Sequence, residues 1–206
     1  MLLSGDMSWS QIALCWGAII VIATIYVVIK GMIGKKKAET GEDRQTVWGI
    51  LQKTVPDVEN YTRAYASWEW STRQGRRTTT SYWYYGIAFN DERLYVVPLS
   101  CEGGDISYTE GFVIEKDSLG IVNTIKGTNW VELYDKNRAE IISLMVEGEN
   151  LNYDKFQPVN IIQEEEAKTF AEWKDKWMDE VNDANGVTVT GMKKRPLENG
   201  QVLTRE

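Results

Sequence analysis

The N-terminal part of the chain carries one long apolar run. From residue 7 to residue 29 there are 23 consecutive positions without a charged side chain. As a helix, residues 12–33 would reach about 33 Å, which is enough to cross a hydrocarbon layer of about 30 Å. We therefore predict a transmembrane helix over residues 11–33, preceded by a short segment at 1–10.

A basic cluster directly follows the apolar run and gives the predicted span a direction. Residues 1–10 contain no Lys or Arg and do contain Asp6, unlike the basic start of a cleaved secretory signal. The positive-inside rule therefore places segment 1–10 outside the cell membrane and the rest of the chain in the cytoplasm. The residues that form this topology signal are Lys30, Lys35, Lys36 and Lys37.

A polar stretch and a short helix are predicted after the span. Residues 34–45 are basic and polar, and Gly34 and Gly41 are expected to loosen this linker. Over 46–56 the apolar residues recur at helical spacing, and Pro56 ends the run. This helix either covers the domain that follows or docks on another membrane protein, and the first interpretation is favoured because apolar stripes usually face their own core.

The middle of the soluble part has the pattern of an antiparallel sheet. Aromatic and β-branched residues dominate 61–71 and 78–89, so we predict two strands joined by a polar loop at 72–77. About seven strands, mostly joined by short turns, favour antiparallel pairing over alternating β and α units. The further strands are predicted at 93–99, 111–115, 120–126, 130–134 and 138–146.

A second amphipathic helix is predicted at 163–182. Three acidic residues lie in its first turn, where the helix dipole favours negative charge. Its apolar stripe suits it to cover an open end of the sheet, and residues 183–206, which lack sustained periodicity, are predicted to be a flexible tail. The stripe consists of Phe170, Trp173, Trp177 and Val181. The fold class predicted is one transmembrane helix followed by a mainly β, α+β domain at 46–182.

Composition narrows the classes of function. Four of the 23 basic residues and one of the 30 acidic residues precede residue 38, so the remainder has a net charge of −10 and disfavours nucleic acid as a partner. The chain contains no histidine, and Cys101 therefore has no imidazole to activate it as a nucleophile. We expect no enzymatic activity, no cofactor and no metal site.

Two segments of the predicted sheet carry a family resemblance. Residues 82–99 read Tyr-Trp-Tyr-Tyr-Gly-Ile-Ala-Phe-Asn-Asp-Glu-Arg-Leu-Tyr-Val-Val-Pro-Leu, and with 111–146 they resemble the middle of bacterial pleckstrin-homology-like (PH-like) domains, here membrane-anchored. The resemblance implies an antiparallel barrel of about seven strands with a C-terminal capping helix. It also implies binding of proteins, peptides or lipid headgroups rather than catalysis.

Two groups of residues are candidates for binding. The resemblance implies a lipid or phosphate site on the loop between the first two strands, where Arg73, Arg76 and Arg77 lie, although a solvated basic turn is the favoured interpretation of these residues. The candidate surface for a protein partner consists of Trp68, Trp70 and Trp83, whose alternative place is the core.

The expected function is that of a membrane-tethered, non-catalytic binding or scaffold protein. Its cytoplasmic domain would engage a protein partner at the membrane, where a tether raises the effective concentration of the two. Two alternatives stay open: binding of anionic lipid headgroups through the first strand-strand loop, and an extracytoplasmic role as a subunit of a secretion or conjugation assembly.

Overall fold

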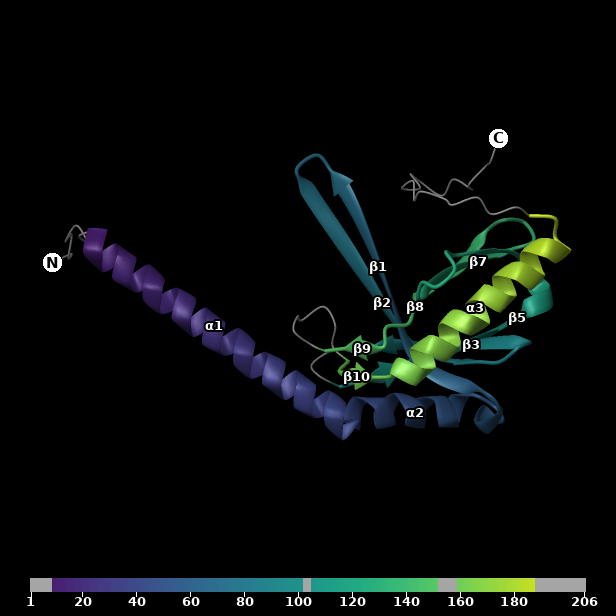
Figure 1. Cartoon of the computed structure of the whole chain (residues 1–206), viewed down its shortest axis with the longest axis horizontal. Coiled ribbons are helices and arrows are strands. Elements are labelled where there is room, and N and C mark those ends of the chain that lie inside the picture. The colour runs from purple at the N-terminus through teal and green to yellow at the C-terminus, as the bar shows by residue number, and fades with distance from the viewer. Residues whose placement is uncertain (1–8, 102–104, 152–158, 188–206) are drawn as a thin grey trace.

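The computed structural model describes residues 9–101, 105–151 and 159–187. A long helix leads into a body in which two further helices pack on a curved sheet (Figure 1). The helices are α1 (Trp9–Thr40), α2 (Glu42–Thr54) and α3 (Glu164–Ala184), with short 3₁₀ turns at Val58–Asn60 and Lys116–Ser118.

Helix α1 is long and apolar enough to cross a membrane. Residues 15–29 are all exposed, and Ile22, for example, shows 66% of its surface. An apolar surface of this size is not stable in water and needs lipid or protein around it.

The basic stretch after the apolar run is helical rather than loose. Helix α1 continues to Thr40, so most of the linker predicted at 34–45 belongs to a helix. Lysine and glutamate are good helix formers, and a helix already nucleated by the apolar run propagates through them at little cost. The break comes at Gly41, where a φ of 69° turns the chain into α2.

The sheet is antiparallel, as predicted, and its order follows two strand meanders. One sheet of eight strands has the order β4-β3-β2-β1-β8-β7-β6, with β5 pairing β3, and a separate pair joins β9 to β10. The strands are β1 (Thr62–Gln74), β2 (Arg77–Phe89), β3 (Arg93–Ser100), β4 (Ser107–Tyr108), β5 (Phe112–Glu115), β6 (Leu119–Asn123), β7 (Trp130–Asp135), β8 (Glu140–Met145), β9 (Glu149–Asn150) and β10 (Ile161–Ile162).

Strands β1 and β2 form a longer hairpin than predicted. They pair without interruption from Thr62 opposite Phe89 to Gln74 opposite Arg77. The polar loop predicted at 72–77 is therefore wrong, because only two residues, beginning with Gly75 at a φ of 61°, connect the strands. The threonines of this region are β-branched, and they extend the strands in spite of their polarity.

The outer part of this hairpin leaves the sheet. Strand β8 pairs with β1 only at Ser67, and β3 pairs with β2 only from Tyr84 onward. Residues 68–83 consequently extend from the body as a two-stranded ribbon, which we call the outer ribbon (Figure 1).

The core lies between the sheet and α3. The predicted apolar stripe of α3 is buried there, and the indole N–H groups of Trp173 and Trp177 donate to the backbone oxygens of Asn90 and Asp91 at 2.7 and 3.1 Å. The C-terminal helix predicted at 163–182 is thus confirmed. It begins one residue later and ends two residues later than predicted. On the opposite face of the sheet, α2 packs Val47 and other apolar residues against β1 and β2.

Two amide side chains, one at the N-cap of α3 and one in its last turn, replace missing strand partners. Gln163 accepts from the N–H of Tyr65 at 2.9 Å and donates to the C=O of the same residue at 2.8 Å. Asn182 bonds both backbone groups of Val122 in the same way, at 3.0 and 2.9 Å. The helix therefore satisfies backbone groups at two open strand edges, on β1 and on β6.

Candidate functional site

The outer ribbon brings the three predicted partner-surface tryptophans together. Residues directly opposite in an antiparallel pair share a face, and Trp68 lies opposite Trp83 while Trp70 lies opposite Ser81. Trp83 exposes 42% of its surface, and the other two tryptophans are half-buried. None of the three is a core residue, so the outer ribbon presents an aromatic face.

The opposite face of the hairpin carries tyrosines. Tyr82 and Tyr84 lie on the face opposite to Trp83, as predicted, because successive side chains of a strand point to opposite faces. Burial raises the pKa of Tyr84 to about 12, and the neighbouring Cys101 and Tyr82 add to this shift. Tyr84 therefore keeps its hydroxyl proton near neutral pH and acts as a hydrogen-bonding group without charge.

The three predicted arginines lie at the end of the outer ribbon. We call this end, residues 73–77, the basic tip. Arg76 lies in the turn, whereas Arg73 and Arg77 are strand residues beside it, and all three are exposed. The Arg73 guanidinium donates to the backbone oxygen of Gly75 at 3.3 Å. Within the described ranges none of the three arginines forms an ion pair, so their forked donors are open to an anion.

The lysines that predict the topology lie in the C-terminal half of α1. Lys35 is 4.0 Å from Glu39 and Lys37 is 3.9 Å from Asp43, while Lys36 is exposed. The side chain of Lys30 falls outside the part of the chain that the structure describes.

A buried carboxylate fixes the corner between α1 and α2 to the domain. Asp43, at the start of α2, accepts from the backbone N–H of Asn160 at 2.8 Å and from its side-chain amide at 3.2 Å. The sequence offered no sign of this contact, because 117 residues separate the two. It ties the corner between α1 and α2 to the residue that directly precedes β10.

The candidate nucleophile and the possible metal ligands can be examined in the described ranges. Cys101 is half-buried, and burial together with the charge of Asp43 raises the pKa of its thiol to about 11, so little nucleophilic thiolate exists near neutral pH. In the described ranges, no three His, Cys, Asp or Glu side chains are placed to hold a metal ion.

A polar cluster that the sequence did not indicate lies on strands β6 and β7. The buried carboxylate of Glu132 accepts from the amide of Asn123 at 2.7 Å and from the hydroxyl of Tyr134 at 3.1 Å. Burial and the charge of Glu132 raise the pKa of Tyr134. These hydrogen bonds satisfy buried polar groups and stabilise the two strands.

The outer ribbon is accordingly the part of the described structure that combines exposed aromatic rings with open charged donors. No protein-family model matches the chain, and no curated protein matches it either.

Proposed function

We propose that this chain is a single-pass membrane protein whose cytoplasmic PH-like domain binds another protein at the membrane and carries out no catalysis. Helix α1 supports the anchor, since its apolar surface is exposed over a length that spans a bilayer. The lysines after the apolar run support the cytoplasmic orientation.

The order of the sheet supports the PH-like assignment. One meander runs from β1 through β3 to β4 and β5, another runs from β6 to β8, and β1 joins them by pairing with β8. A C-terminal helix then packs on the sheet. The resemblance of residues 82–99 and 111–146 implies an antiparallel barrel of about seven strands with a C-terminal capping helix, and this sheet and helix are compatible with it.

The single observation that carries partner binding is the aromatic face of the outer ribbon. A two-stranded ribbon is marginally stable in water on its own, and it gains stability when another surface covers it. Tryptophan is the residue type that most often supplies binding energy at protein interfaces. We therefore assign the partner to the face formed by Trp68, Trp70 and Trp83.

Photo-crosslinking in native membranes tests this assignment. A benzophenone amino acid replaces Trp83 in the full-length chain, and Tyr108 serves as the matched control because it is an exposed aromatic residue, at 44% against 42%, on β4 and outside the outer ribbon. We expect an adduct of one discrete protein mass at position 83 only. The adduct should be lost when Trp68→Ala and Trp70→Ala are added.

Two results would contradict the proposal. Equal adducts at positions 83 and 108 would indicate nonspecific proximity, and adducts with lipid alone would assign the aromatic face to the bilayer. The orientation is checked separately by protease treatment of intact cells. Digestion of the domain from outside would favour the extracytoplasmic alternative.

A further inference from the structure

We infer that the partner binds as an added β-strand, which pairs with the free edge of β1 in the outer ribbon and contacts the aromatic face with its apolar side chains. This inference rests on the proposed function, since it concerns how that partner binds at the same site. It goes further by naming the conformation and the side-chain chemistry of the bound segment.

In the described ranges, one edge of β1 has no strand beside it beyond Ser67. Backbone groups of a strand point to alternate edges, and those of Tyr65 point away from β2, because the side chain of Gln163 binds both of them. Strand β1 pairs with β2 in unbroken register, so Glu69 and Ser71 point to the same edge as Tyr65. At that edge Ser67 pairs with β8, and no described strand pairs with the two residues beyond it.

Strand β8 separates from β1 at the same point and forms the second side of a fork. Ser67 lies opposite Met145, and beyond this pair the described residues of the two strands do not pair. We call the region between residues 69–71 of β1 and residues 141–143 of β8 the fork. In an unbroken sheet these two segments would lie opposite each other, whereas Figure 1 shows the ribbon and β8 diverging.

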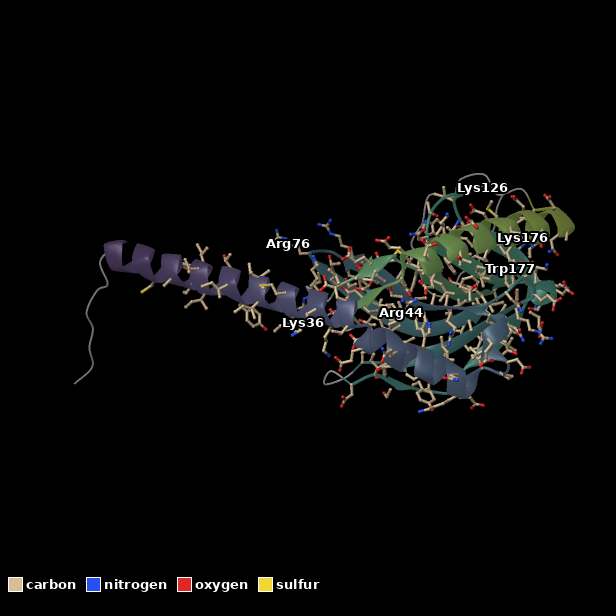
Figure 2. All side chains as sticks on the ribbon, turned by 60° about the horizontal axis from the view of Figure 1, so that its bottom comes forward. Lys36, Arg44, Arg76, Lys126, Lys176 and Trp177 are labelled. Atoms are coloured by element: carbon tan, nitrogen blue, oxygen red, sulfur yellow. The ribbon has the colours of Figure 1, made fainter. Side chains whose placement is uncertain are left out.

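The edge of β1 is accessible in the fork. Glu69 and Ser71 are exposed, and Ile141 on the β8 side shows 36% of its surface. Figure 2 places Arg76, at the end of the ribbon, on the opposite side of the body from Trp177, so helix α3 does not cover the end of the ribbon. An exposed strand edge offers N–H and C=O groups to another strand, which gains main-chain hydrogen bonds there.

The fork differs from the opposite edge of the ribbon, on β2, in having a second strand nearby. A strand in the fork lies between β1 and β8, whereas a strand on the β2 edge at residues 77–83 would have one described neighbour. A strand with two neighbours satisfies backbone groups on both of its edges. The fork is therefore the edge that the partner takes.

The side chains of the added strand lie in two rows. Residues opposite each other on neighbouring strands share a face, and the side chains of β1 alternate between two faces. One row of the added strand therefore lies beside Trp68 and Trp70, on the aromatic face, where apolar side chains fit best. The other row lies beside Glu69, Ser71 and Arg73.

Two charged residues of β1 specify the second row. Glu69 and Arg73 are exposed, and among the described residues neither belongs to an ion pair. Opposite charges directly across a strand pair stabilise it, and like charges destabilise it. The bound segment therefore carries a basic residue opposite Glu69 and an acidic residue opposite Arg73, four positions apart, with apolar residues between them on the other face.

Photo-crosslinking from β8 tests whether the partner enters the fork. A benzophenone amino acid replaces Ile141 in the full-length chain in native membranes, and the same replacement of Ile125, an exposed isoleucine outside the fork, is the control. We expect the adduct found at Trp83 to appear at Ile141 with the same mass, and to be absent at Ile125.

A pair of proline variants tests the backbone pairing. Ser71→Pro removes an N–H that points into the fork, whereas Thr80→Pro removes one that points to the opposite edge of the ribbon. The two residues lie opposite each other and share a hydroxyl hydrogen bond of 2.8 Å, so both variants lose that bond, and neither loses a backbone bond between β1 and β2. We expect Ser71→Pro to lower the adduct yield at Trp83 about fivefold, the effect of one lost hydrogen bond, and Thr80→Pro to leave it unchanged.

Charge variants keep the test independent of how well the ribbon tolerates proline. Glu69→Lys places a positive charge opposite the basic residue of the segment and should lower the adduct yield at Trp83 about fivefold. Glu59→Lys changes the net charge equally at an exposed position before β1 and should leave the yield unchanged.

Each other outcome overturns the inference. An adduct at Trp83 without one at Ile141 leaves the proposed function standing, with a partner that covers the aromatic face but does not enter the fork. Equal losses from Ser71→Pro and Thr80→Pro would mean that the partner does not pair with this edge of β1. An adduct that joins Ile141 to residues 188–206 of the same chain would make that segment the occupant. If no adduct forms at Trp83, the proposed function fails and this inference fails with it.

Discussion

The buried amide of Gln163 offers the strongest test of how the fold is held together. This side chain exposes 1% of its surface and makes three hydrogen bonds, two with the backbone of Tyr65 and one with the carbonyl of Glu147 at 2.9 Å. Replacing it by alanine leaves three backbone groups without partners beneath α3. We expect the free energy of unfolding to fall by about 3 kcal/mol, at about 1 kcal/mol for each lost bond.

Urea unfolding of the full chain in detergent micelles measures this loss. Asn182→Ala, which removes two hydrogen bonds to Val122, should cost about 2 kcal/mol in the same assay. Gln163→Glu keeps the shape but places an acceptor against two carbonyl oxygens. Burial favours its neutral form, so its penalty should shrink as the pH falls through the raised pKa of the new carboxyl group. A loss below about 1 kcal/mol for Gln163→Ala would refute the reasoning, because water would then be satisfying the exposed backbone groups.

The remaining predictions concern two glycines and one thiol. Gly120→Ala should destabilise the domain by about 1–3 kcal/mol in urea unfolding, since its Cβ would meet the backbone oxygen of Asp135. Gly49→Ala should stabilise α2 by about 0.5–1 kcal/mol, because nothing lies within 4 Å of its Cβ; a loss there would contradict the helix packing. Iodoacetamide should modify Cys101 slowly near neutral pH and faster as the pH approaches about 11. Mass spectrometry of the modified peptide measures the rate, and fast modification near neutral pH would contradict the raised pKa.

The helices were predictable because each has one dominant local signal. The apolar run sets α1, and the spacing of Phe170, Trp173 and Trp177 sets the buried face of α3. Charge and glycine over 34–45 indicate a linker, but neither stops a helix that the apolar run has already nucleated, so α1 continues through the lysines to Thr40. Residues 188–206 of the predicted tail lie outside the described structure, so that prediction stays open.

The candidate site was predictable in composition but not in placement. Period-two alternation correctly put Trp68 and Trp70 on one face. Their exposure depends on where β8 and β3 stop pairing with the hairpin, at Ser67 and Tyr84, which is a consequence of long-range packing. No local pattern encodes the end of such a pairing.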